Sequence, residues 1–338
     1  MKPYIIAGPC SAETEAQVLE TAKAVAAAGA DAFRAGLWKP RTRPGSFEGV
    51  GGRGLEWLVK AGAETGLRVC TEVASAAHIR ECIASGIDMV WLGARTTTNP
   101  FLVQEIADAL AGSGVTVIVK NPVSPDLELW KGAVERLKAA GLKDIILVFR
   151  GVSSDSCAPL RNSPHWSMAV EMRTAFPDLR MLCDPSHMGG DRVLVPELSA
   201  QAVSLGLDGL MVEVHFAPQE ALSDSRQQLS PREYSILLQN LPNRDMFTTD
   251  SNFNRQLEQF RARIDELDGT IISAIAERMA ISRKIGELKK QSGVAIIQPS
   301  RWEKVLDNVS ARASALGVDP EFVRSLYSGL HKESVKEQ

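Results

Sequence analysis

The sequence lacks several features that mark common classes of protein. No apolar run in its 338 residues approaches the roughly 20 residues of a membrane span. The formal net charge of −3 gives no support to nucleic-acid binding. Five cysteines, an odd number without a CxxC pair, indicate reduced thiols and a cytoplasmic location rather than a disulfide framework. Because the residues from Met1 to Tyr4 lead directly into a strand-like run, we also expect no signal peptide.

Eight short apolar runs recur before about residue 216, and most segments between them have helical apolar spacing. Several runs are continuous rather than alternating, as is typical of parallel strands buried on both faces. Eight strand–helix units in about 230 residues predict an α/β fold, a closed (β/α)8 TIM barrel. An open doubly wound sheet is the alternative, but no GxGxxG motif follows the first run. The predicted strands are Tyr4–Ala7, Ala32–Ala35, Arg68–Val73, Met89–Leu92, Val115–Lys120, Ile145–Phe149, Arg180–Cys183 and Leu210–Val214.

A small all-helical domain is predicted after the barrel. Residues 241–251 carry Pro, Asn, Asp and Thr without periodicity and predict a linker, which places the barrel at 1–240 and the helical domain at 252–338. The first of its three helices would run from Asn252 to Gln291, about 60 Å, with an apolar stripe along one face. The rest of the domain is too small to cover such a helix, so we expect a homodimer through this domain.

Four potential metal ligands follow or end predicted strands: Cys10, His187, Glu213 and Asp224. The strand ends of a barrel converge on one face, where the chemistry lies. Taken singly, each has a plainer explanation, as a buried apolar cysteine or a helix-capping carboxylate. Taken together, a thiolate, an imidazole and two carboxylates predict one divalent cation, of a kind such as Mn, Fe, Co or Zn rather than Ca or Mg.

Basic side chains occupy the ends of the other strands. A single arginine there is most simply a surface ion pair, but six cations are more than four acidic or thiolate ligands require. Arginine offers a planar fork and lysine a point charge to phosphate, so the set predicts phosphorylated substrates. The residues are Arg34, Lys39, Arg41, Arg95, Lys120 and Arg150, with the hydroxyl of Thr42 and the carboxylate of Glu72 beside them.

The motifs that carry these residues resemble one family. GPCS, KPRT, GAR, the lysine of the fifth strand, FRG, DPSH and GLMVEVH…ALSD are similar to the type Iβ 3-deoxy-D-arabino-heptulosonate-7-phosphate (DAHP) synthases, over essentially all of residues 1–240. The resemblance implies condensation of phosphoenolpyruvate with erythrose 4-phosphate, the first reaction of the shikimate pathway to aromatic amino acids. It also implies one bound metal, with manganese favoured.

Position by position, the resemblance assigns three groups of residues. It makes Cys10, His187, Glu213 and Asp224 the metal ligands. It makes Arg34, Lys39, Arg95, Lys120 and Arg150 the phosphoenolpyruvate contacts, and Arg41 and Thr42 the erythrose 4-phosphate contacts. Lys39 would donate a proton near the aldehyde oxygen, with Glu72 orienting it.

The sister family, the 3-deoxy-octulosonate 8-phosphate synthases, is the nearest alternative because it shares the barrel and the phosphoenolpyruvate site. Its members carry a KANRS-type sequence where this chain has KPRT at Lys39–Thr42. KPRT favours the four-carbon aldehyde.

Residues 252–338 resemble the all-helical chorismate mutases, through RxxID at Arg261–Asp265, AERM at Ala276–Met279, GxxK at Gly286–Lys289, Arg301 and the segment Ser334–Gln338. The resemblance implies rearrangement of chorismate to prephenate. This reaction needs only a site that holds two carboxylates and stabilises charge on the ether oxygen. By the same resemblance Arg261, Arg278, Arg301 and Ser334 bind the substrate, while Lys289 and Gln338 contact the ether oxygen.

Helical geometry supports part of this assignment. Arg278 and Lys289, eleven residues apart, fall within about 20° of one helix face, whereas Arg261 points about 100° away and would reach a partner's site. Trp302 stands where many mutases have Glu, and Gln298 replaces a common Asp. The alternative is therefore a non-catalytic dimerisation and regulatory tail. In both cases we expect the tail to mediate feedback inhibition by prephenate or chorismate.

Overall fold

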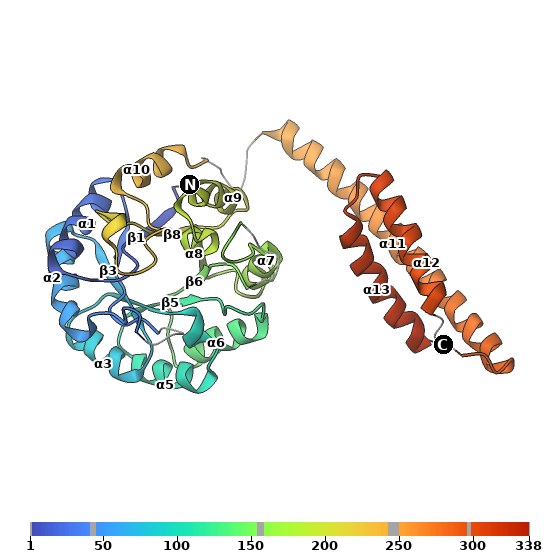
Figure 1. Cartoon of the computed structure of the whole chain (residues 1–338), viewed down its shortest axis with the longest axis horizontal. Coiled ribbons are helices and arrows are strands. Elements are labelled where there is room, and N and C mark those ends of the chain that lie inside the picture. Colours follow the sequence, from blue (N-terminus) through green and yellow to red (C-terminus); the bar gives the residue numbers. More distant parts are fainter. Residues whose placement is uncertain (1, 41–44, 154–158, 243–249, 296–298, 338) are drawn as a thin grey trace. The chain divides into compact units, whose positions relative to one another are not determined.

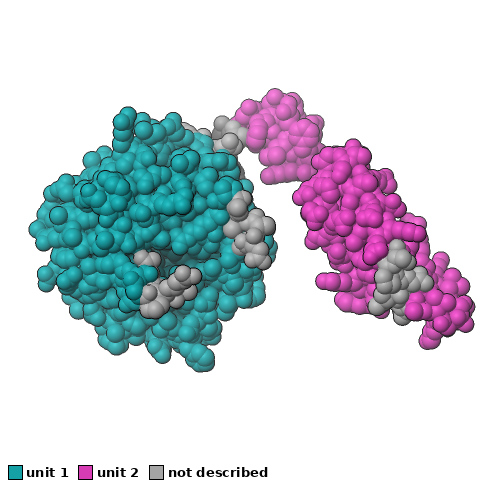
Figure 2. All heavy atoms as spheres, viewed as in Figure 1, with its two compact units in different colours: residues 1–246 teal, residues 247–338 magenta. Residues whose placement is uncertain are grey.

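The computed structural model describes residues 2–40, 45–153, 159–242, 250–295 and 299–337. The chain forms two compact units, Met1–Met246 and Phe247–Gln338 (Figure 1 and Figure 2). The division between them falls inside the segment 241–251 that the sequence predicts to be a linker. The domain limits of 1–240 and 252–338 stay a prediction.

The first unit is a closed barrel of eight parallel strands, which confirms the predicted fold (Figure 1). Each strand pairs with the next along the chain, and the last pairs with the first in a register that sets Tyr4 opposite Gly209. A side chain at Gly209 would collide with the Tyr4 backbone, so this closure requires glycine. The strands are β1 (Tyr4–Gly8), β2 (Ala32–Arg34), β3 (Arg68–Val73), β4 (Met89–Leu92), β5 (Thr116–Lys120), β6 (Ile145–Phe149), β7 (Arg180–Cys183) and β8 (Gly209–Glu213).

Helices surround the strands and begin at sequence-encoded caps. The side chains of Thr14, Ser75, Asn99, Asp126 and Ser230 each accept a backbone N–H at a helix start. The outer helices are α1 (Glu15–Ala27), α2 (Leu55–Thr65), α3 (Ala76–Ala84), α5 (Pro100–Leu110), α6 (Leu127–Ala139), α7 (Trp166–Ala175), α9 (Val195–Ser204) and α10 (Pro231–Asn240). Two short helices, α4 (Ala94–Thr97) and α8 (Pro185–Gly189), directly follow β4 and β7. They therefore lie where the strands end.

The inside of the barrel changes from apolar to charged along the strands. Its apolar layer includes Ala32, Cys70, Ile118 and Met211, all buried. Two residues further on, and so on the same face of each strand, the charged residues begin. They are Arg34, Glu72, Lys120 and Glu213. The apolar side chains thus fill the barrel interior, and the charged side chains lie above them at the carboxyl ends of the strands.

The described residues of the second unit form three helices: α11 (Ser251–Gln291), α12 (Pro299–Ala315) and α13 (Pro320–Glu337). This confirms the predicted helical domain. The long helix α11 has 41 residues, and α13 packs against both α11 and α12. Within the described parts of the chain, no helix combines the length and the apolar character of a membrane span.

Candidate active site

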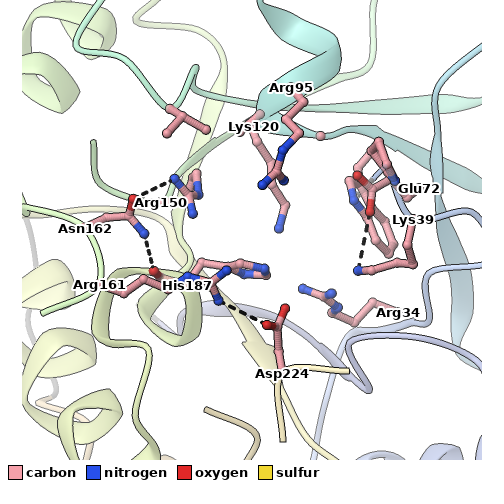
Figure 3. A pocket seen from close by; sticks show the side chains of 15 residues that line it. Arg34, Lys39, Glu72, Arg95, Lys120, Arg150, Arg161, Asn162, His187 and Asp224 are labelled. Carbon is pink, nitrogen blue, oxygen red and sulfur yellow. Dashed lines mark hydrogen bonds and ion pairs between the residues drawn. The ribbon is translucent and has the colours of Figure 1, made fainter. Parts of the chain in front are cut away.

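A polar pocket lies at the carboxyl ends of the barrel strands (Figure 3). Arg34, Lys39, Arg95, Lys120 and Arg150, the described cations that the sequence analysis selected, all line it. Their side chains approach from β2, β5 and the segments after β2, β4 and β6, together with Glu72 from β3. Arg41 and Thr42 lie outside the described residues.

The four predicted metal ligands meet beside this pocket. One donor atom each from Cys10, Glu213 and Asp224 lies within 4.8 Å of the others, and Cys10 Sγ is 3.4 Å from Asp224 Oδ2. His187 Nε2 is 3.6 Å from Glu213 Oε1, which brings the imidazole to the same cluster. Burial, reinforced by the charge of Glu213, raises the pKa of the Cys10 thiol to about 12. At neutral pH the thiol therefore stays protonated and donates a hydrogen bond to Asp224 Oδ2.

Asp184 fixes the orientation of His187. Its Oδ1 accepts the backbone N–H of His187 at 3.0 Å, and its Oδ2 lies 2.8 Å from His187 Nδ1. Lys120 Nζ donates to the same Oδ2 at 2.6 Å. Although burial opposes ionisation, His187 and Lys120 hold the pKa of Asp184 well below its usual range. With Nδ1 bonded to this carboxylate, Nε2 is the nitrogen left to face Glu213.

Asp184 was not predicted as a site residue, although the DPSH motif contains a signal for it. An Asp immediately before a proline at the first helical position is a helix N-cap pattern, and the third helical residue here is His187. The cap therefore places the imidazole on the side of the carboxylate.

Arg34 combines a buried ion pair with unused donors. Its Nη2 lies 3.0 Å from Glu213 Oε1, with both side chains buried, and its guanidinium lies 4.9 Å from the centre of the Trp91 ring. In the described part of the chain, its buried Nε and Nη1 atoms have no hydrogen-bond partner. A buried donor without a partner costs free energy, so an anion that accepted hydrogen bonds from these two atoms would bind favourably.

Lys39 connects the predicted metal ligands to Glu72. Its Nζ lies 3.1 Å from the Cys10 carbonyl oxygen, 3.2 Å from Cys10 Sγ and 3.6 Å from Glu72 Oε2. Burial opposes its charge, but Cys10 and Glu72 outweigh this and raise the pKa of Lys39. Gly93 lets Glu72 come close, because a side chain at this position would collide with the Glu72 carboxylate.

Arg150 and two neighbours form the other side of the pocket. Arg150 Nη1 donates to Asn162 Oδ1 at 3.0 Å, and Asn162 Nδ2 donates to the His187 carbonyl oxygen at 2.6 Å. Burial lowers the pKa of Arg150 to about 10, so it remains charged at neutral pH. Arg161 Nη1 lies 3.2 Å from Asp224 Oδ1. Arg161 and Asn162 were not predicted, because they belong to an irregular segment that gives no periodic signal.

In the helical unit, Arg278 and Ser334 come together. Arg278 Nη1, on α11, hydrogen-bonds the Ser334 hydroxyl and lies 3.3 Å from the Leu330 carbonyl oxygen, both on α13. Arg261 is exposed and pairs with Glu258 of its own helix at 2.8 Å. Lys289 is half-buried near the end of α11, and Arg301 is exposed on α12. Gln298 and Gln338 lie outside the described residues.

Trp302, at the position where many mutases have a glutamate, does not stand alone. Its ring stacks on His331 of α13, with centroids 4.1 Å apart and planes inclined by 11°. The stack joins α12 to α13.

A closed barrel with cations and a thiol–imidazole–carboxylate cluster at its strand ends, followed by a helical unit, defines a two-domain TIM-barrel enzyme. Residues 1–245 match the family model described as the DAHP synthetase I family, and the chain belongs to this family. Residues 260–338 match the model of chorismate mutase type II. The chain is therefore a bifunctional enzyme of aromatic biosynthesis, with a transferase domain and an isomerase domain, and the resemblance found in the sequence is confirmed.

Similar proteins include members of both sister families. Phospho-2-dehydro-3-deoxyheptonate aldolase of Thermotoga maritima is 37% identical over 238 residues, which cover 70% of this chain and 68% of the relative. A 2-dehydro-3-deoxyphosphooctonate aldolase of Nitratidesulfovibrio vulgaris is 33% identical over 240 residues, covering 65% and 84%. The crystal structure of the Thermotoga enzyme gives a TM-score of 0.64 at 33% identity, over 70% of this chain and 67% of that one.

Proposed function

We propose that the barrel condenses phosphoenolpyruvate with erythrose 4-phosphate to DAHP, and that the helical unit rearranges chorismate to prephenate. The observation that carries the first part is the pocket lined by five predicted cations, beside the cluster of Cys10, His187, Glu213 and Asp224. Two phosphorylated substrates need such a concentration of positive charge, because their mutual repulsion must be offset before their reacting carbons can meet.

The donor set of the cluster fits a divalent metal. Thiolate and imidazole ligands favour Mn, Fe, Co or Zn over Ca and Mg, and manganese is our preferred assignment. The fit is supported by the Asp184 carboxylate behind His187, which is the usual outer partner of a metal-binding histidine. When bound, such a cation supplies Lewis acidity toward the aldehyde oxygen.

The cations of the pocket would divide the work of substrate binding. Arg34, with its unused Nε and Nη1 atoms, and Lys120 would hold the inner end of phosphoenolpyruvate. Arg95 and Arg150 would bind its phosphate, and Arg41 and Thr42 that of erythrose 4-phosphate. Lys39 keeps its proton until negative charge develops on the aldehyde oxygen, to which it would then donate, and Glu72 orients its ammonium group.

In the helical unit, we assign Arg278 and Ser334 to a carboxylate of chorismate and Lys289 and Gln338 to its ether oxygen. No metal takes part. Arg301 is our candidate for the second carboxylate. These assignments rest on the family match and on the contact between Arg278 and Ser334.

The apolar face of α11 supports a homodimer. Phe260, Ile264, Leu267 and Ile271 follow one another at helical spacing, and each is between 46% and 70% exposed. A second copy of this helix would cover them. Arg261, on the same part of α11, would then contribute to the partner's site.

A non-catalytic tail is the second candidate for the helical unit, and the stack of Trp302 on His331 favours it. Trp302 stands in place of the glutamate that would bind the substrate hydroxyl, and its ring is stacked on His331. In either case we propose that prephenate or chorismate bound to this unit inhibits the synthase, which requires the ligand to prefer one state of the protein.

Two assays on one preparation of the full chain test the proposal. The first measures loss of phosphoenolpyruvate with erythrose 4-phosphate or arabinose 5-phosphate, and we expect turnover only with the former to be efficient. Equal or better turnover of the five-carbon sugar would indicate that the barrel is a 3-deoxy-octulosonate 8-phosphate synthase instead. The second measures disappearance of chorismate, and no disappearance would leave the tail with a regulatory role only.

A further inference from the structure

Two consecutive glutamines that play no part in the roles above lie against the cluster of Cys10, His187, Glu213 and Asp224. Gln227 and Gln228 are 1% and 0% exposed. The segment that carries them runs parallel to the chain at the end of β8, through a bridge between Val214 and Leu229. There the Leu229 N–H donates to the Glu213 carbonyl oxygen, and the His215 N–H donates to the Leu229 carbonyl oxygen, both at 2.9 Å. The backbone of this segment is thus fixed relative to Glu213.

Gln227 holds one carboxylate of the cluster. Its Nε2 donates to Glu213 Oε2 at 2.8 Å, while its Oε1 accepts from Arg161 Nη1 at 2.8 Å. Arg34 donates to the other oxygen of Glu213 at 3.0 Å. With one donor on each oxygen, the carboxylate plane of Glu213 cannot rotate without breaking a buried hydrogen bond.

Gln228 joins the loop of Cys10 to the loop of Asp224. Its Oε1 accepts the backbone N–H of Cys10 at 3.0 Å, and its Nε2 donates to the carbonyl oxygen of Ser223 at 2.8 Å. Ser223 immediately precedes Asp224, whose φ of 45° lies in the left-handed region that residues other than glycine rarely adopt. Such a conformation persists only where the surroundings hold it, and Gln228 is one of the groups that do so.

Only an amide suits both positions. Each side chain uses one donor and one acceptor, and it adds no charge to a buried site. Glutamate would lose the donor, and at position 227 it would set a second carboxylate against Glu213. Methionine has the same length but can make neither hydrogen bond.

We propose that Gln227 and Gln228 are positioning residues of the metal site. Gln227 sets the orientation of Glu213, and Gln228 sets the separation of Cys10 from Asp224. The inference rests on the metal site of the proposed function. It assigns the geometry of three ligands to two residues that touch neither substrate nor metal.

Cobalt binding to the full-length protein, stripped of metal with EDTA, tests the assignment without measuring synthase turnover. The variants are Gln227→Met and Gln228→Met. Gln201→Met is the control, since the Gln201 side chain donates to Glu197 on the same helix, α9, away from the pocket. Outer partners of metal ligands are worth about 10–100-fold in affinity, so we expect Co²⁺ dissociation constants to rise by that factor in both variants and to stay unchanged in the control.

The absorption band of cobalt bound to a thiolate separates the two roles. At saturating Co²⁺, Gln228→Met should weaken this band because Cys10 is displaced, whereas Gln227→Met should retain it. Thermal unfolding of the same samples shows whether the barrel of each variant is folded. Gln228→Glu, which keeps the acceptor for the Cys10 amide, replaces Gln228→Met if that variant does not fold, and it should also bind cobalt more weakly.

The outcomes distinguish the inference from the metal site itself. Wild-type affinity and an unchanged band in the folded variants would overturn the positioning role alone. A wild-type protein that binds no Co²⁺ would overturn the proposed metal site, and the positioning role with it.

Discussion

Replacing Lys120 with methionine separates its contribution to stability from its proposed part in binding phosphoenolpyruvate. Lys120 Nζ lies 2.6 Å from Asp184 Oδ2, and the two side chains are 5% and 0% exposed. Removing one partner of a buried ion pair leaves a buried charge uncompensated, which costs about 3–5 kcal/mol. Asp184 keeps its contacts with His187, so we expect a loss near the lower limit, about 3 kcal/mol.

The double variant Lys120→Met/Asp184→Asn tests the cause of that loss. It removes both charges of the Lys120–Asp184 pair, so no uncompensated charge of that pair is left buried. Most of the lost stability should therefore return. Synthase activity should not return, because the cation that the substrate requires is still missing. Lys23→Met is the matched control, since Lys23 pairs with Glu64 at 3.1 Å while 53% and 35% exposed. It should cost less than about 1 kcal/mol.

Urea unfolding followed by tryptophan fluorescence suits this measurement, because five of the six tryptophans belong to the barrel unit. A loss of less than about 1 kcal/mol for Lys120→Met would refute the reasoning from the buried pair. So would a double variant as unstable as the single one. Recovery of synthase activity in the double variant would instead refute the role of Lys120 in substrate binding.

Three further outcomes are expected. Cys10→Ala should lose both bound metal and synthase activity, and EDTA treatment of the wild type should have the same effect, while mutase activity survives in both cases. Metal analysis together with both activity assays checks this. A Cys10→Ala protein with wild-type synthase turnover would show that Cys10 is not a ligand. Erythrose 4-phosphate should be used at least about tenfold more efficiently than arabinose 5-phosphate, measured as kcat/KM. Prephenate should inhibit the full-length synthase but not a version ending at Leu241, and Arg278→Ala should lower mutase activity roughly 100-fold and weaken the inhibition. Equal inhibition of both lengths would show that the tail is not the sensor.

The barrel could be predicted from the sequence because its strands are buried on both faces. Runs such as Ile145–Phe149 are continuous and apolar, and turn residues limit them clearly. The predicted limits of the eighth strand were wrong by one residue at each end, since the strand spans Gly209–Glu213 rather than Leu210–Val214. Its start is set by pairing with Tyr4, a long-range contact that local composition does not encode.

The predicted site was more complete for residues on strands than for residues on loops. Glu72, Lys120 and Glu213 could be found because strand ends converge in a barrel. Arg161, which lines the pocket, and Gln227 and Gln228, which contact the cluster, lie in irregular segments, where no periodicity relates sequence position to direction. Asp184 had a local signal as a helix cap, but its ion pair with Lys120 depends on the closed barrel, which brings the carboxyl ends of β5 and β7 together although β6 lies between them.

Closure of the barrel between β1 and β8 also determines when activity can arise during synthesis of the chain. Cys10 and Gln228 are bonded across more than 200 residues, so the cluster is incomplete until the last loop of the barrel has left the ribosome. Such long-range pairing makes folding slow. The roughly 110 residues after Gln228 take about 5–20 s to translate at 5–20 residues per second. The synthase pocket therefore has time to form while the helical unit is still being made.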